Sequence, residues 1–331
     1  MDGFLIDVLI QGLLYGVMSL GVVISYRVLD FADLSVDGTF PLGAAVSAML
    51  IVNGVNPWLA LAASLLAGVV AGFITGFLHV KLKIEGLLAG ILVMTGLYSV
   101  NLMVAGGSIS GSVSNIGLYN FPNIFTTDWL VALGAPNVLI TNYRLIVLVV
   151  ITLLIKLVID WVLKTRLGYL MKVTGDNEGL VAPLGHSVGT VKIVGLALSN
   201  GIVALSGGLA ASVNRYYDIT IGQGMIVLGL SSVILGTTLL RKFRFNDTTK
   251  VIVGAIAYRM IVALAIKNGL EAQHMKLMTV IIFVAVIIIQ KSSLKTFVAK
   301  YFPKANKGTQ GSVSSDETPS NSNEKAKKEE V

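Results

Sequence analysis

The sequence contains no cysteine, so disulfide bonds, thiolate nucleophiles and cysteine-based metal sites are excluded. Its three histidines (His79, His186 and His274) are far apart and show no metal-ligand spacing. The patterns of a P-loop, of an H-E-x-x-H zinc protease and of a G-x-S-x-G hydrolase are also missing. Together with the lack of any convincing cluster of Ser, His and acidic residues, this predicts that the chain is not an enzyme and binds no cofactor.

Charged residues are scarce, at 13% of 331 residues, whereas 54% are apolar and the mean hydropathy is +0.81. A soluble domain carries about twice that share of charge. Several apolar runs reach the roughly 20 residues that a helix needs to cross a bilayer, and strand-like alternation is missing. The sequence therefore predicts an all-α polytopic membrane protein. Its net charge of +7 is assigned to loops that face the cytoplasm and not to a nucleic-acid partner.

About nine transmembrane helices are predicted, and the second is expected to be discontinuous. Their approximate ranges are 5–26, 32–52, 58–80, 87–104, 145–163, 193–213, 225–240, 251–266 and 276–289. Basic loops follow the third, fifth and seventh spans and a basic tail follows the ninth, which predicts an external N-terminus and a cytoplasmic C-terminus. Residues 1–302 form the predicted membrane domain, 303–331 a disordered tail. Residues 105–143 contain no Lys or Arg and are expected outside, with 121–133 as a surface helix or re-entrant piece.

A polar, basic stretch at 164–192, KTRLGYLMKVTGDNEGLVAPLGHSVGTVK, lies between two apolar runs. We interpret its interior as a short cytoplasmic helix that begins at a polar cap and is bent or ended by a proline. A link between two spans needs no such helix, but a docking surface for a soluble partner does. The candidate coupling residues are Asp176, Asn177, Glu178, Ala182, Pro183 and Gly185.

A second unusual stretch, RVLDFADLSVDGTFPLG at 27–43, places three aspartates beside an apolar run. A helix that enters the membrane here is expected to break near 37–41, and broken helices are tolerated where they are buried in protein or line a cavity. The candidate pathway residues are Asp33, Ser35, Asp37, Gly38 and Thr39. Asp33 and Asp37 could instead form an aspartyl dyad, or a proton relay in an ion-coupled secondary transporter.

Further along, Tyr98 and Asn101 could line a polar route, or could simply hydrogen-bond between helices. The row Gly68, Gly72 and Gly76 is interpreted as a face for close helix packing.

Several of these motifs resemble the permeases of bacterial ABC importers for branched-chain amino acids and ribose-type sugars. TRLG at 165–168, GDN at 175–177 and the spaced Ala182, Gly185 and Val188 resemble their coupling segment. DLSVDG at 33–38 resembles their broken-helix motif, and SGGLAAS at 206–212 and VILGTT at 233–238 resemble later spans. The resemblance covers about residues 5–290.

The sequence FADLSVDGTFPLGAAV at 31–46 resembles that of a subgroup of these permeases, which work with lipoprotein receptors for tryptophan and related aromatic amino acids. Pro183 and His186 depart from the usual apolar residues of the coupling helix. The resemblance implies a multi-pass protein of the bacterial cell membrane. Its implied partners are a cytoplasmic ATP-binding subunit that holds ATP and Mg, an extracellular substrate-binding lipoprotein, and a second permease copy in the surrounding membrane lipid. Whether that copy is identical or a paralogue is left open.

Overall fold

The computed structural model describes residues 2–106, 114–127, 136–181, 187–269 and 274–291, which belong to one structural unit. Ten α-helices occur in these residues. They are α1 (Asp2–Val22), α2 (Val36–Val52), α3 (Pro57–Val80), α4 (Gly86–Gly106), α6 (Asn137–Val162), α7 (Arg166–Asp176), α8 (Val188–Asn214), α9 (Met225–Leu239), α10 (Asp247–Lys267) and α11 (Met275–Lys291). A π-helical segment, Val23–Val28, extends α1.

Seven helical stretches in the described residues are long and apolar enough to cross a membrane. They are α1 with its π-helical extension, α3, α4, α6, α8, α9 together with the 3-10 turn before it (Ile219–Leu239), and α10. The predicted all-helical membrane architecture is therefore confirmed. Helices α2 and α11 occupy the predicted second and ninth spans, but each has only 17 residues. The number of nine spans stays a prediction.

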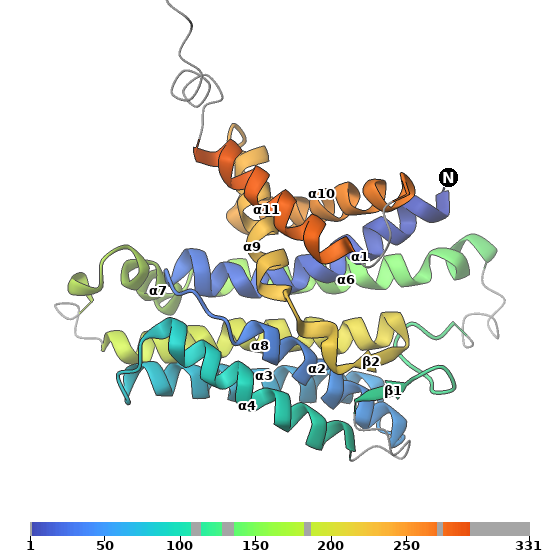
Figure 1. Cartoon of the computed structure of the whole chain (residues 1–331), viewed down its shortest axis with the longest axis horizontal. Helices are drawn as coiled ribbons and strands as arrows, with labels where there is room; N and C mark the ends of the chain where they lie inside the picture. Colours follow the sequence, from blue (N-terminus) through green and yellow to red (C-terminus); the bar gives the residue numbers. More distant parts are fainter. Residues whose placement is uncertain (1, 107–113, 128–135, 182–186, 270–273, 292–331) are drawn as a thin grey trace, which may run out of the picture. The chain divides into compact units, whose positions relative to one another are not determined.

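A pair of short antiparallel strands departs from the purely helical prediction. Strand β1 (Asn115–Gly117) pairs with β2 (Tyr216–Asp218), with Ile116 opposite Tyr217. Residues 121–127 form turns and not the start of a helix, and the remainder of the predicted 121–133 piece lies outside the described residues. In Figure 1 the strand pair lies at one end of the long helices and α7 at the other. That the two segments face opposite sides of the membrane stays a prediction.

Helix α8 forms the centre of the bundle and packs against α1, α2 and α3. Its contact with α3 is close because the α3 glycines face it: a Cβ atom added at Gly76 would lie 2.8 Å from Ile193 Cα. A Cβ at Gly68 or Gly72 would overlap the α8 backbone. The predicted role of this glycine row in helix packing is confirmed.

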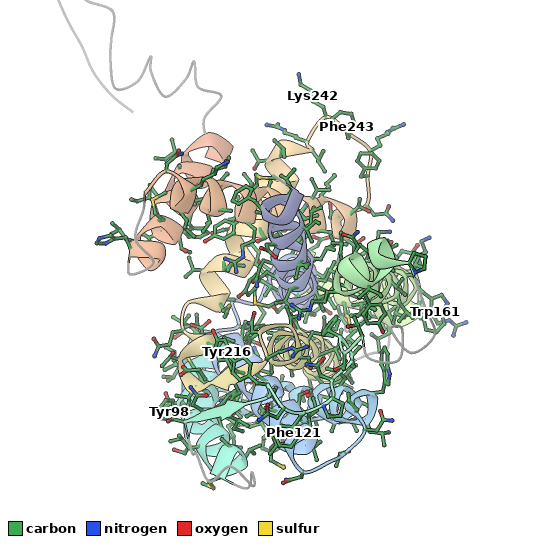
Figure 2. All side chains as sticks on the ribbon, turned by 90° about the vertical axis from the view of Figure 1, so that its right-hand side faces the viewer. Tyr98, Phe121, Trp161, Tyr216, Lys242 and Phe243 are labelled. Carbon is green, nitrogen blue, oxygen red and sulfur yellow. The ribbon has the colours of Figure 1, made fainter. Side chains whose placement is uncertain are left out.

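The outer face of α6 shows what surrounds the bundle. Leu153, Leu157 and Trp161 are spaced by four residues and are 51%, 63% and 69% exposed. Figure 2 shows Trp161 pointing away from the other helices. An apolar stripe of this kind is the surface that a spanning helix presents to lipid.

The break in the second span lies earlier than predicted. Helix α2 begins at Val36 and runs through Pro41 without interruption, so the irregular segment is 29–35 and not 37–41. Pro41 is the sixth helical residue, and its missing N–H removes one hydrogen bond near the start of the helix. A second break, which was not predicted, separates the 3-10 turn Ile219–Gly222 from α9.

Candidate functional site

Two helices, α2 and α9, begin next to each other, and one side chain joins their starts. The Asp37 carboxylate, in the first turn of α2, accepts hydrogen bonds from the backbone N–H groups of Gly224 (3.0 Å) and Ile226 (2.7 Å). Gly224 is the N-cap of α9 and has a φ of +84°, which a residue with a side chain rarely adopts. A carboxylate here satisfies free N–H groups and is favoured by the helix dipole. Asp37 therefore caps α9 from another helix.

Asp33 holds the irregular segment in front of α2 against α8. Its side chain is 1% exposed and accepts hydrogen bonds from Ser35 N (2.9 Å), Ser35 Oγ (2.5 Å) and Asn200 Nδ2 (2.6 Å). Ser35 Oγ also lies 3.2 Å from Asn200 Oδ1. These donors surround the carboxylate, so the network meets the hydrogen-bonding needs of a buried acid in the irregular segment before α2.

A pocket of about 380 Å³ opens beside these two helix starts. It is bounded by the first turns of α2, by one face of α4 and by the segment before α9. Its lining residues are Asp37, Gly38, Pro41, Met94, Thr95, Tyr98, Asn101, Ile219, Gln223 and Gly224. Four predicted pathway residues thus meet in one place: Asp37, Gly38, Tyr98 and Asn101.

Asn101, one of the lining residues, carries a hydrogen-bond acceptor without a partner among the described residues. The residue is 1% exposed, and its Nδ2 donates to the carbonyl of Gly38 (3.1 Å). Its Oδ1 is buried and has no hydrogen-bond partner among the described residues. A buried amide oxygen without a partner is costly unless a ligand or water fills the need. Tyr98, one turn away on α4, is 53% exposed.

The remaining predicted pathway residues do not line the pocket. Asp33 and Ser35 stand behind it in the network with Asn200, and the Thr39 hydroxyl donates to the carbonyl of Ser35 within its own chain segment (3.0 Å). These three residues shape the start of α2. Among the contributors that were not predicted are Asn200 and the Gln223–Gly224 segment, which lies between the predicted spans 193–213 and 225–240. The close spacing of Gly222 and Gly224 is the feature of the sequence that could have predicted this second break, before α9.

The pocket has the composition of a binding site and not of a catalytic one. Its walls combine apolar surface from Pro41, Met94 and Ile219 with a few polar atoms, which is the usual make-up of small-molecule sites. In the described part of the chain, no group of three or more His, Asp or Glu side chains could hold a metal ion. The arrangement can hold and release a small solute.

The predicted coupling segment begins with α7, whose N-cap is Thr165. Asp176 is the last residue of α7 and Asn177 its C-cap, and the short helix that they were predicted to begin is only a 3-10 turn in the described residues. Asn177 Oδ1 instead accepts a hydrogen bond from Gly179 N (3.0 Å) in the 3-10 turn Glu178–Leu180. Ala182, Pro183 and Gly185 lie outside the described residues. Helix α7 packs on the π-helical end of α1, where a Cβ at Gly175 would overlap the carbonyl of Val28.

The family profile described as "Branched-chain amino acid transport system / permease component" matches residues 4–291. The chain belongs to this family. It is a multi-pass ABC-transporter permease, and ATP is hydrolysed on a separate subunit. The family implies two kinds of partner, an ATP-binding subunit and a substrate-binding protein.

Relatives of the permease span nearly its whole length. It is 39% identical to the tyrosine transport system permease protein of Clostridioides difficile over 305 residues, 91% of this chain and 97% of the relative. It is 31% identical to an uncharacterised protein of Rickettsia prowazekii, over 88% of this chain and 99% of the relative. Similarity to the ribose import permease protein RbsC of Bacillus subtilis is lower, at 28% over 79% of this chain and 77% of the relative.

Proposed function

We propose that this permease forms the translocation pathway of an ATP-driven importer for an amino acid, with aromatic amino acids such as tyrosine and tryptophan as the favoured solutes. The observation that carries the proposal is the pocket at the starts of α2 and α9, with the unused Oδ1 of Asn101 beside the exposed ring of Tyr98. An amide oxygen can accept a hydrogen bond from the ammonium group of an amino acid, and an aromatic ring can pack against an aromatic side chain. The relative that carries tyrosine transport in its name supports this choice of solute.

The movement proposed for transport follows from the position of α7. A cytoplasmic ATP-binding subunit would hold the 164–192 segment, including Glu178, Ala182, Pro183 and Gly185. Helix α7 contacts the π-helical end of α1, and the chain runs from there directly into the Asp33 network and α2. A displacement of α7 would therefore reach the wall of the pocket through a short, well-packed route.

The remaining assembly is proposed on the same basis. The N-terminus lies outside the cell and the C-terminus in the cytoplasm, a second permease copy completes the pathway, and a receptor lipoprotein delivers solute to the segments 105–143 and 214–224. Asp33 and Asp37 serve the break in α2 and not a proton relay, because their oxygens already accept hydrogen bonds from neighbouring donors.

Reconstituted transport tests the proposal. The permease, its ATP-binding subunit and its receptor are placed in proteoliposomes, and ATP-dependent uptake of labelled tyrosine, tryptophan, phenylalanine and ribose is compared. We expect uptake of an aromatic amino acid, and at least a tenfold loss in the Asn101→Leu variant. Met103→Leu, on the same helix but 73% exposed and outside the pocket lining, is the matched control. Uptake of ribose alone, or uptake driven by an ion gradient without ATP, would rule the proposal out.

A further inference from the structure

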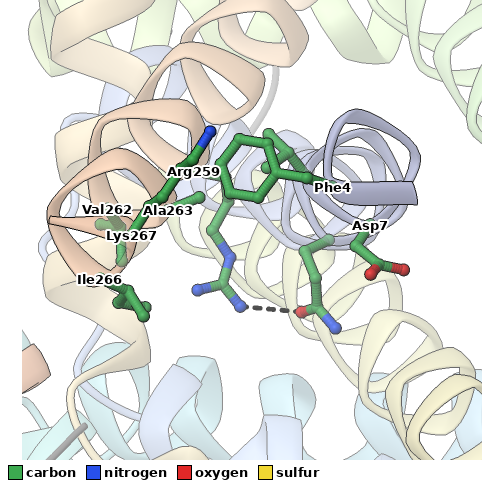
Figure 3. A pocket seen from close by; sticks show the side chains of 9 residues that line it. Phe4, Asp7, Arg259, Val262, Ala263, Ile266 and Lys267 are labelled. Atoms are coloured by element: carbon green, nitrogen blue, oxygen red, sulfur yellow. Dashed lines mark hydrogen bonds between the residues drawn. The ribbon is translucent and has the colours of Figure 1, made fainter. Parts of the chain in front are cut away.

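A second pocket, of about 360 Å³, lies between α1 and α10 and shares no lining residue with the pocket at Asp37. One stripe of each helix forms its walls. The lining residues are Phe4, Asp7, Val8 and Gln11 from α1, and Arg259, Val262, Ala263, Ile266 and Lys267 from α10. Figure 3 shows Arg259 pointing toward α1 between these walls, with Lys267 and Phe4 close to each other.

Arg259 is held in place but retains unused hydrogen-bond donors. Its Nη2 donates to Gln11 Oε1 (2.8 Å), and its Cζ lies 4.3 Å from the centre of the Tyr15 ring. Gln11 is fixed in turn by Asn214, whose Oδ1 lies 3.4 Å from Gln11 Nε2. The Nε of Arg259 is buried and has no partner among the described residues. A guanidinium has five N–H donors, so these contacts leave most of its capacity for an anion unfilled.

The position of Arg259 makes its unfilled hydrogen-bond donors unusual. It lies eight residues before Lys267, the last residue of α10, which corresponds to about 12 Å along the helix. An arginine this far inside a spanning helix is costly, and such residues usually pair with an acid or mark a functional site. No carboxylate within the described ranges forms an ion pair with Arg259.

The rest of the pocket is suited to an apolar body below a charged rim. Val8 and Val262 are buried, and Ala263 and Ile266 continue the apolar wall. At the rim, Lys267 Nζ lies 5.2 Å from the centre of the Phe4 ring, and Asp7 is exposed. The two cations and one acid give the lining a net positive charge.

We propose that this pocket binds a small organic monocarboxylate with an apolar body. The carboxylate meets the free donors of Arg259, which is the partner that a planar guanidinium favours. The apolar body lies between Val8, Val262 and Ala263, and Lys267 adds a second cation at the entrance. A phospholipid fits less well because its phosphate stays at the membrane surface, about 12 Å from the level of Arg259. This inference does not depend on which solute passes the pocket at Asp37.

Binding to the intact complex tests the proposal. The permease is purified with its ATP-binding subunit in nanodiscs, and calorimetry compares 3-phenylpropionate with 3-phenylpropionamide, a neutral molecule of the same shape. We expect the carboxylate to bind at least tenfold more tightly than the amide, and Arg259→Gln to remove this preference. Arg241→Gln, which removes an exposed arginine elsewhere, should leave binding unchanged.

A second variant covers the case in which Arg259→Gln fails to fold. Ala263→Leu keeps the guanidinium but fills the pocket, so it should weaken 3-phenylpropionate binding at least tenfold while thermal unfolding stays close to that of the parent. Equal affinity for the acid and the amide, or unchanged binding in both pocket variants, would overturn the proposal. So would a phospholipid that native mass spectrometry finds retained on the parent complex and lost from Arg259→Gln.

Discussion

The Asp37 carboxylate on α2 accepts a hydrogen bond from the backbone N–H of Gly224, the residue that caps α9. The two residues are 187 positions apart in the sequence. Each belongs to a helix that begins next to the same pocket, so one side chain sets the relative position of two pocket walls. A solute bound in this pocket, as proposed above, would therefore be linked to the positions of α2 and α9 through one carboxylate.

Replacing Asp37 should destabilise the start of α9 in a graded manner. Asp37→Ala leaves the N–H groups of Gly224 and Ile226 without their acceptor. The exposed Gly224 N–H can turn to water, whereas the partly buried Ile226 N–H costs about 1–3 kcal/mol when it is unsatisfied. Asp37→Asn keeps one acceptor oxygen and should fall between the parent and Asp37→Ala. The unfolding temperatures of the purified parent and of the two variants give the order of their stabilities. An Asp37→Asn protein of parental stability that has lost all uptake would show that the charge acts in transport and not only as a cap.

The Asp33–Asn200 hydrogen bond should appear as a coupled pair in a double-mutant cycle. Both side chains are buried, and each loses a hydrogen-bond partner when the other is removed. We expect each of the variants Asp33→Ala and Asn200→Ala to lower the free energy of unfolding. The loss in the double variant should be smaller than the sum of the two single losses by about 1–3 kcal/mol. Thermal unfolding of the four proteins gives this coupling energy. Strictly additive effects would mean that Asp33 depends on Ser35 alone.

Close packing of α3 on α8 predicts opposite outcomes for two glycine-to-alanine changes. A Cβ at Gly72 would lie 2.8 Å from Ala197 Cα and would overlap the carbonyl of Leu196, so Gly72→Ala should destabilise the protein by more than about 1 kcal/mol. Gly96, within α4, has nothing within 4 Å of its added Cβ, so Gly96→Ala should be neutral or slightly stabilising. Unfolding temperatures compare the two. Equal effects would contradict the close contact at Gly72.

The sequence was sufficient for those features that depend on local composition. Apolar run length located the helices, and glycine spacing identified the α3 face that packs on α8. Asp37 and Gly38 were singled out as part of the expected broken helix, and Tyr98 and Asn101 as polar residues that could line a route; these four line one pocket. Residues 121–133 were expected to form a surface helix or re-entrant piece, but 121–127 form turns, and the short strand at Asn115–Gly117 was not predicted.

Features that depend on tertiary contacts could not be predicted in this way. Nothing local to Asn200 indicates that its amide binds Asp33, because the two residues lie 167 positions apart. The break before α2 was misplaced because Pro41 was taken as its position, whereas a proline this close to a helix N-terminus removes only one backbone hydrogen bond. Asp37, in the first turn of α2, also ties that turn to α9 through Ile226 N. The pocket at Arg259 was missed because its cation, its walls and its rim come from the two ends of the chain.

The predicted docking role of the coupling segment can be separated from folding. Ala182→Arg and Gly185→Trp each place a bulky side chain at a small residue of the segment that we expect to sit on the ATP-binding subunit. Uptake should fall at least tenfold, while the amount of folded permease and its unfolding temperature stay close to those of the parent. The measurement combines uptake, ATP hydrolysis and co-purification of the ATP-binding subunit.

A bulky residue at the other end of the helices provides the control. Gly106→Trp lies at the end of α4, where nothing lies within 4 Å of an added Cβ, so it should leave the interaction with the ATP-binding subunit intact. If Ala182→Arg and Gly185→Trp retained normal uptake and still bound the ATP-binding subunit, that subunit would have to contact another cytoplasmic segment. The basic loop between α9 and α10, with Arg241, Lys242 and Arg244, would then be the next segment to test.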